Sequence, residues 1–215
     1  MRFELPPLTY DYHALAPVFG RDSLKLHHDS LHAEYIRRLN DTLDGRQRDC
    51  AHLPCLEEML WDIGKLPADL RQPVRNFGGG HLNHTLFWQI MSPGGRGEPD
   101  TLLQSAIEHN FGGMEELKAE FFMEAMSRFG SGWVWLVLDI HDRLVVVSTP
   151  NQDSPLMLGM APVLGLDLWE HAYLPRFGIQ RGDYVKAWWD LINWETANRL
   201  RTEGVETIRR AYSNG

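Results

Sequence analysis

Apolar residues recur every three or four positions over several stretches of the first 92 residues, which is the spacing of one face of an α-helix. The clearest stretch covers residues 23–43, and Ser23 is suited to cap the N-terminus of this predicted helix. A shorter helix is expected at residues 55–66, because Pro67 follows it. Residues 1–22 contain three prolines and predict an irregular arm.

Residues 68–91 carry two opposing signals. The glycines at 78–80 argue for a break, since each glycine costs about 1 kcal/mol in a helix interior. The residues after the glycines return to helical spacing, which favours a helix up to about residue 91. Residues 92–99 then contain three glycines and two prolines and are the best linker candidate in the chain.

The second half mixes helical and β-type patterns. Helical spacing occurs at residues 101–110 and 113–128. Two β-rich runs separated by three polar residues predict a hairpin, and a third apolar run completes a small sheet before a helical tail. These segments are residues 133–140, 144–148, 162–169 and 183–212. The predicted fold class is α+β, with a helical domain at residues 1–92 and an α+β domain at residues 93–215.

Composition and charge exclude several classes of protein. Hydrophobic residues make up 43% of the 215 residues, which is enough for a sizeable core and excludes intrinsic disorder. The net charge of −8 disfavours nucleic acid as a partner. The longest apolar run is too short for a membrane span and the N-terminus lacks a signal-peptide pattern, so we expect a cytoplasmic protein. Cys50 and Cys55 are too few for a disulfide-built fold and are typical of free thiols.

Ten histidines make metal chemistry the leading candidate. His27 lies on the first predicted helix, His81 and His84 are three residues apart on the second, and Asp167 and His171 are four apart after the third β run. Imidazole and carboxylate donors suit manganese, iron or zinc, and the lack of cysteine in these segments argues against structural zinc. Spacing leaves a second interpretation open, in which each histidine is an ordinary hydrogen-bonded residue.

Longer motifs are more specific than these spacings. The stretch Asp-Leu-Trp-Glu-His-Ala-Tyr at residues 167–173 resembles a motif of the iron/manganese superoxide dismutase family. Other stretches resemble that family in the order expected along the chain, namely residues 5–15, 27–35, 79–88, 129–136, 151–153 and 192–194.

The resemblance implies a fold, a reaction and a metal. The family has an N-terminal antiparallel helical hairpin and a C-terminal α+β domain around a three-stranded antiparallel sheet, so the second helix is expected to run through the glycines. The implied reaction converts superoxide to O2 and H2O2 at a mononuclear centre. Carried over position by position, the metal ligands are His27, His84, Asp167 and His171.

The resemblance also implies the residues around the ion. Gln152 matches the glutamine that hydrogen-bonds the bound solvent, and Tyr35 matches its neighbour at the substrate entrance. Trp133 and Trp169 match the aromatic wall that keeps the site dry. In typical iron enzymes of the family the glutamine comes from the second helix, at the position of Gly80 here. We therefore expect one manganese ion per subunit, with iron as the alternative.

The chain departs from the family at Leu31 and Leu174, where the family has a histidine and a tyrosine that pair across the dimer interface. Glu170, which in the family reaches the metal-binding histidine of the partner subunit, is retained, as is Arg181, which matches a funnel arginine. We expect a homodimer, with a tetramer as the alternative. The two leucines are the only support for another function, a metal-binding protein on the same scaffold with weak or no dismutase activity. A non-haem iron oxygenase fits three histidines and an aspartate poorly.

Overall fold

The first long helix is continuous but changes its winding in the middle. The computed structural model describes residues 2–46, 48–49 and 55–213. Helix α1 (Arg21–Leu26) passes into a π-helical turn (His27–His32) and then into α2 (Ala33–Leu43). The helix begins after Gly20, so the prediction that Ser23 caps it is wrong; the Ser23 hydroxyl lies inside the first turn and donates to the Gly20 carbonyl at 2.8 Å.

The second helix of the hairpin runs straight through the glycine triplet. Its pieces are α4 (Ala68–Pro73), a π-helical turn (Val74–Gly78) and α5 (Gly79–Gln89), so the break predicted from glycine propensity is wrong and the helix implied by the family resemblance is confirmed. Close packing explains the glycines, because a Cβ on Gly78 would lie 2.9 Å from Leu56 Cδ1. Leu56 belongs to α3 (Leu56–Trp61), which a short 3-10 helix (Ile63–Lys65) follows.

The sheet has the three antiparallel strands expected. Strands β1 (Gly132–Leu138), β2 (Leu144–Pro150) and β3 (Ala161–Asp167) take the order β2-β1-β3. Every residue of β1 is buried, as expected for the central strand. In the register of the ladder, Trp133 lies opposite Asp167 on one side and Thr149 on the other. This register brings the end of β3 to the edge of the sheet that faces the hairpin.

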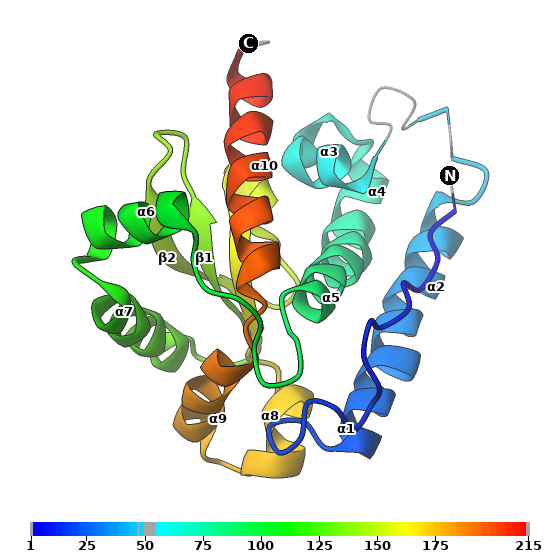
Figure 1. The fold of residues 1–215 in the computed structure, drawn as a ribbon. Coiled ribbons are helices and arrows are strands. Elements are labelled where there is room, and N and C mark those ends of the chain that lie inside the picture. The colour runs from blue at the N-terminus through cyan, green and yellow to red at the C-terminus, as the bar shows by residue number, and fades with distance from the viewer. Residues whose placement is uncertain (1, 47, 50–54, 214–215) are drawn as a thin grey trace.

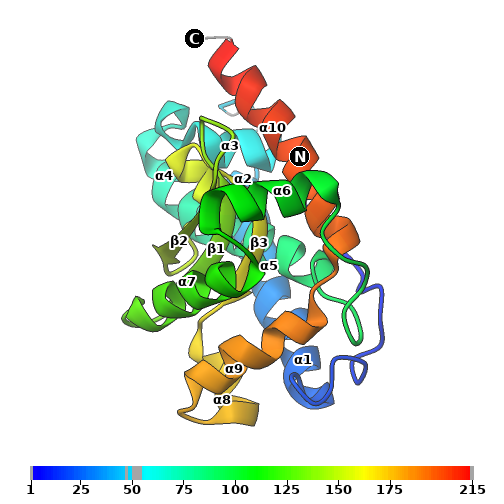
Figure 2. The same cartoon turned by 60° about the vertical axis from the view of Figure 1, so that its left-hand side comes forward.

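Helices cover the sheet and close the molecule. Helices α6 (Thr101–Phe111) and α7 (Met114–Ser127) pack against β2, whereas α5 and α10 (Trp194–Ser213) pack against β3 (Figures 1 and 2). The remaining helices are α8 (Glu170–Phe177), α9 (Arg181–Trp188) and two 3-10 turns (Pro155–Leu158 and Trp189–Leu191). The pattern of apolar residues did not predict α8.

The tail predicted to be helical over residues 183–212 is broken once. Between α9 and α10 the backbone extends at Ile192 and Asn193, which form isolated bridges with Met91 and Arg96. These bridges tie the tail to the segment that follows the hairpin. None of the helices among the described residues combines the length and the apolar character needed to cross a bilayer. Cys55 is a free thiol, whereas Cys50 lies outside the described residues.

Candidate metal centre

Four side chains from four elements converge between the hairpin and the sheet. His27 begins the π-helical turn, His84 lies in α5, Asp167 ends β3, and His171 is the second residue of α8. Each offers one donor atom, and these atoms lie within 4.8 Å of one another. The side chains of His27, His84 and Asp167 are at most 3% exposed and that of His171 is 23% exposed. Access from solvent therefore leads past His171.

The four donor atoms face one another, and two of them lack a hydrogen-bond partner. Asp167 Oδ2 lies 3.2 Å from His27 Nε2, 3.6 Å from His84 Nε2 and 3.3 Å from His171 Nε2. His84 Nε2 and Asp167 Oδ2 are both fully buried and make no hydrogen bond. Buried polar atoms are rarely left in this state, and a cation bound between them would satisfy both.

The backbone orients two of these ligands. His84 Nδ1 donates to the Gly80 carbonyl at 2.6 Å, which leaves the lone pair of Nε2 directed at the centre. The Trp169 amide donates to Asp167 Oδ1 at 2.8 Å, which leaves Oδ2 free for the cluster. Such outer partners fix the tautomer and the direction of a metal ligand.

Electrostatics keep the donors in the form that binds a cation. Burial lowers the pKa of His84 to about 3 and also lowers the pKa of His27, so both imidazoles are neutral near pH 7. Burial alone would raise the pKa of Asp167, but the facing imidazoles of His171 and His27 lower it below its ordinary value. Neutral imidazoles and an ionised carboxylate are the states that metal binding requires.

Gln152 and Tyr35 lie beside the four donors. The Trp133 indole donates to Gln152 Oε1 at 3.0 Å, and the Gln152 amide donates to the Tyr35 hydroxyl at 3.1 Å. Burial, followed by the charge of Asp167, raises the pKa of Tyr35 to about 12. The Tyr35 hydroxyl is therefore protonated, and because its oxygen accepts from Gln152 its own proton is free to be donated.

Two glycines of α5 make room for this pair. A Cβ on Gly80 would lie 2.6 Å from both Cγ and Cδ1 of Tyr35, and a Cβ on Gly79 would overlap the backbone carbonyl oxygen of Gln152. The neighbours of these two glycines are the Tyr35 ring and the segment that carries Gln152.

Of the other predicted residues, Trp169 contacts a ligand, and the rest make contacts outside the four donors. The ring of Trp169 lies 5.8 Å from that of His171, and its indole donates to the Asn151 carbonyl at 2.9 Å. Glu170 accepts from the Ser131 hydroxyl at 2.5 Å. The guanidinium of Arg181 lies 5.3 Å from the centroid of the Tyr173 ring and donates to the Arg128 and Gly130 carbonyls. Leu31 is half-buried, and Leu174 is 44% exposed.

The layer behind the ligands was not predicted. His32 Nε2 and His81 Nδ1 lie 2.8 Å apart, and the Trp88 indole donates to His32 Nδ1 at 3.1 Å. His81, considered above with His84, is thus held by His32 and is not among the four clustered donors. The π-helical turn is the reason, because its wider winding puts His32, five residues after His27, on the same side of the helix. The histidine spacing of five was the signal in the sequence.

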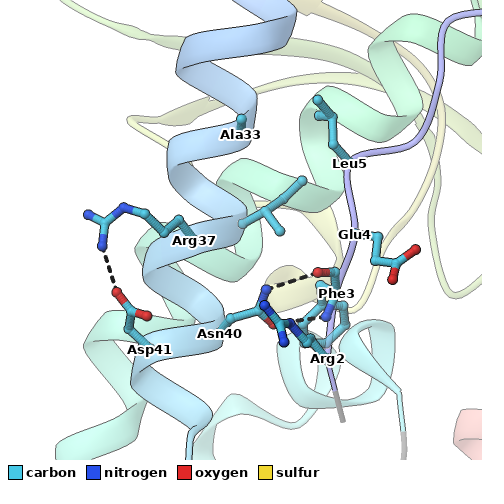
Figure 3. Close-up of a pocket in the computed structure, with 9 residues that line it drawn as sticks. Arg2, Phe3, Glu4, Leu5, Ala33, Arg37, Asn40 and Asp41 are labelled. Atoms are coloured by element: carbon cyan, nitrogen blue, oxygen red, sulfur yellow. Dashed lines mark hydrogen bonds and ion pairs between the residues drawn. The ribbon is translucent and has the colours of Figure 1, made fainter.

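A cavity of about 460 Å3 lies elsewhere, between the N-terminal arm and α2 (Figure 3). The Asn40 side chain crosses it and pairs with the backbone of Phe3, accepting at 2.8 Å and donating at 2.9 Å. None of the residues that line this cavity is one of the four donors. The ring of Phe3 meets that of His81 edge-on at 5.6 Å, so the arm supports the layer behind the ligands.

Comparison with known proteins gives consistent matches to both halves. The model for the α-hairpin domain of iron/manganese superoxide dismutases matches residues 2–92, and that for their C-terminal domain matches residues 99–200. Superoxide dismutase (Mn) of Listeria innocua is 47% identical over 199 residues, which cover 93% of this chain and 97% of that protein. Superoxide dismutase (Mn) of Thermus thermophilus is 45% identical, over 92% of this chain and 96% of that protein.

Proposed function

The chain belongs to the iron/manganese superoxide dismutase family, and on this premise we propose that one manganese ion per subunit is held by His27, His84, Asp167 and His171. The reaction is the dismutation of superoxide, in which two superoxide radicals and two protons give O2 and H2O2. One observation carries the ligand assignment: four donor atoms lie within 4.8 Å, and two of them are buried without a hydrogen bond. Three imidazoles and a carboxylate fit manganese or iron.

A bound manganese ion would supply the one-electron chemistry by alternating between its trivalent and divalent states. The side chains around it would handle the protons. Trp133 occupies the Gln152 carbonyl and so directs the Gln152 amide group at Tyr35, and Tyr35 keeps a proton that it can donate. We propose that Gln152 and Tyr35 hold and move protons, and that Arg181 attracts the anionic substrate.

Manganese is favoured over iron by the position of the glutamine. The relatives compared above carry manganese in their names. At position 80, where the resemblance places the glutamine of the iron type, even a Cβ would meet the Tyr35 ring. A glutamine at position 80 is therefore sterically incompatible with Tyr35 in its present place.

The assembly that we propose is a homodimer, with a tetramer as the alternative. Phe129 is 98% exposed, Ile179 is 89% exposed and Leu174 is 44% exposed. They lie around Arg181, which bonds the carbonyls on either side of Phe129 and packs on the Tyr173 ring next to Leu174. A second copy would cover these apolar side chains. Sedimentation that finds only monomers at micromolar concentration would contradict this assembly.

Two coarser features belong to the same proposal. The division into residues 1–92 and 93–215 is supported by the two family matches, which leave only residues 93–98 between them. A cytoplasmic location, expected from the sequence, is likewise proposed and would be checked by cell fractionation.

The ligand assignment is tested by metal analysis and a dismutase assay on wild-type protein and His84→Ala. We expect about one manganese per wild-type chain, and less than a tenth of that metal and activity in the variant, because three donors no longer enclose the ion. His13→Ala, which alters a histidine outside the cluster, is the matched control and should keep both. Full metal content in His84→Ala would show that the assignment is wrong.

A further inference from the structure

The segment that carries Gln152 is fixed to the hairpin from outside the metal centre. Gln152 lies between strands β2 and β3, but its hydroxyl partner Tyr35 lies on α2. Its amide geometry therefore depends on how firmly this segment is held against the second helix of the hairpin. Two side chains of that helix, Arg75 and Asn83, bind the segment directly.

Arg75 makes the charged contact. Its Nε donates to Asp153 Oδ1 at 2.6 Å, and its Nη2 donates to Asp153 Oδ2, so the guanidinium and the carboxylate form a two-bonded pair. Such pairs fix orientation as well as distance. The Asp153 side chain is only 15% exposed, while that of Arg75 is 47% exposed. The carboxylate would be left partly buried and unpaired without Arg75, which favours withdrawal of residue 153 towards solvent.

Movement of Asp153 would be transmitted to Gln152. The backbone carbonyl of Asp153 accepts from the Thr149 hydroxyl at 2.7 Å, and the backbone carbonyl of Gln152 accepts from the Asn83 side-chain amide at 3.1 Å. Asn83 and Thr149 thus hold the backbone of residues 152 and 153, and Arg75 holds the Asp153 side chain. Of these contacts, that of Arg75 is the one formed by a side chain that solvent reaches easily.

We propose that Arg75 is a positioning residue for the dismutase reaction, which acts through Asp153 to hold the Gln152 amide at its distance from Tyr35. This inference rests on the proposed function. It predicts that Arg75, which touches none of the four ligands, affects the redox properties of the ion through the amide of Gln152.

The test compares Arg75→Met and Arg75→Lys with Arg96→Met in the manganese-loaded protein. Arg96 is the matched control, because it also forms an exposed ion pair, at 2.8 Å, but its partner Glu195 lies on α10 and not on the segment that carries Gln152. We expect Arg75→Met to keep its manganese and lower turnover about three- to tenfold, less than the roughly 10–100-fold typical of a direct outer partner. Its midpoint potential should shift in the same direction as that of Gln152→Ala. Arg75→Lys should recover part of the shift, since lysine restores one charge but not the two-bonded geometry.

Hydrogen exchange of residues 150–154 separates this proposal from the proposed function. Faster exchange is expected in Arg75→Met and not in Arg96→Met, whether or not the protein turns over superoxide. A wild-type protein that binds manganese but lacks dismutase activity would contradict the proposed function alone. If Arg75→Met matches Arg96→Met in potential, turnover and exchange, the positioning role is refuted. Should Arg75→Met not fold, Asp153→Asn takes its place, and an unchanged potential in that variant would refute the role equally.

Discussion

Replacing Gly80 by alanine tests whether the packing of α5 against Tyr35 controls the site. A Cβ at this position would lie 2.6 Å from Cγ and Cδ1 and 3.0 Å from Cδ2 of Tyr35, so it would press on the face of the ring close to its attachment. The ring cannot rotate away from a contact at Cγ. It must move as a whole, and its hydroxyl bond to Gln152 would lengthen from 3.1 Å.

The change in the free energy of unfolding follows from one stabilising and two destabilising terms. Alanine in place of a helix-interior glycine stabilises by about 1 kcal/mol. Overpacking a filled interior costs roughly 1–3 kcal/mol, and loss of the Tyr35–Gln152 bond costs about 1 kcal/mol more. Gly80→Ala should therefore be destabilised by about 1–3 kcal/mol, which corresponds to a melting temperature lower by about 2–12 °C. Turnover should fall at least about tenfold, because Tyr35 and Gln152 are displaced together.

Calorimetry and a dismutase assay would measure both effects, with Gly64→Ala as the matched control. Gly64 also lies in a helical segment, but a Cβ there would meet nothing within 4 Å. The control should be as stable as the wild type or more stable by up to about 1 kcal/mol. A Gly80→Ala protein that melts at or above the wild-type temperature with full turnover would show that Tyr35 does not depend on this glycine.

Three further outcomes are expected. Gln152→Ala should keep most of its manganese but lower turnover about 10–100-fold, as measured by metal analysis and a dismutase assay, since an outer hydrogen bond is lost and no ligand is; unchanged turnover would exclude a role for this amide. Leu31→His alone should destabilise the dimer by roughly 1–3 kcal/mol by burying an unpaired imidazole, and Leu174→Tyr in addition should recover part of this. Strictly additive single and double variants in denaturant titrations would show that the two leucines do not meet across the dimer. Burial lowers the pKa of His81 to about 4, whereas the unfolded value is near 6.5, so the unfolded state binds more protons between these values. The free energy of unfolding of the metal-free protein should therefore fall as pH drops from 6.5 towards 4, by roughly 1–3 kcal/mol more than in His81→Gln. If urea titrations show the same pH dependence for the wild type and His81→Gln, the pKa of His81 is not lowered in the folded protein.

Local patterns predicted the helices and strands whose apolar faces repeat regularly. The strands at Trp133 and Leu144 and the first helix of the hairpin were found in this way. Patterns failed where a tertiary contact overrides local preference. Gly78, Gly79 and Gly80 disfavour a helix, yet the helix continues through them. Glycine is needed at these positions because Leu56, Gln152 and Tyr35 occupy the space that side chains would need.

The candidate site shows the same limit. Spacing could pair His81 with His84 and Asp167 with His171, but it could not decide which imidazoles converge, because that depends on how hairpin and sheet dock. The resemblance to a family supplied the set of four. Neither route predicted the π-helical turn that begins at His27, since its hydrogen bonds differ from those of an α-helix by a single residue.

The distribution of the four donors makes the centre a cross-link. His27 and His171 are 144 residues apart in the chain, and their Nε2 atoms are 3.2 Å apart in space. An ion bound by both would join distant parts of the polypeptide, and because these donors come together only in the folded chain, its binding free energy would add to the stability of the fold. Because His27 and His84 come from the hairpin and Asp167 and His171 from the sheet side, separation of these two parts would take the proposed site apart. Release of the ion should then become faster in conditions that loosen the contact between the hairpin and the sheet, such as low concentrations of urea.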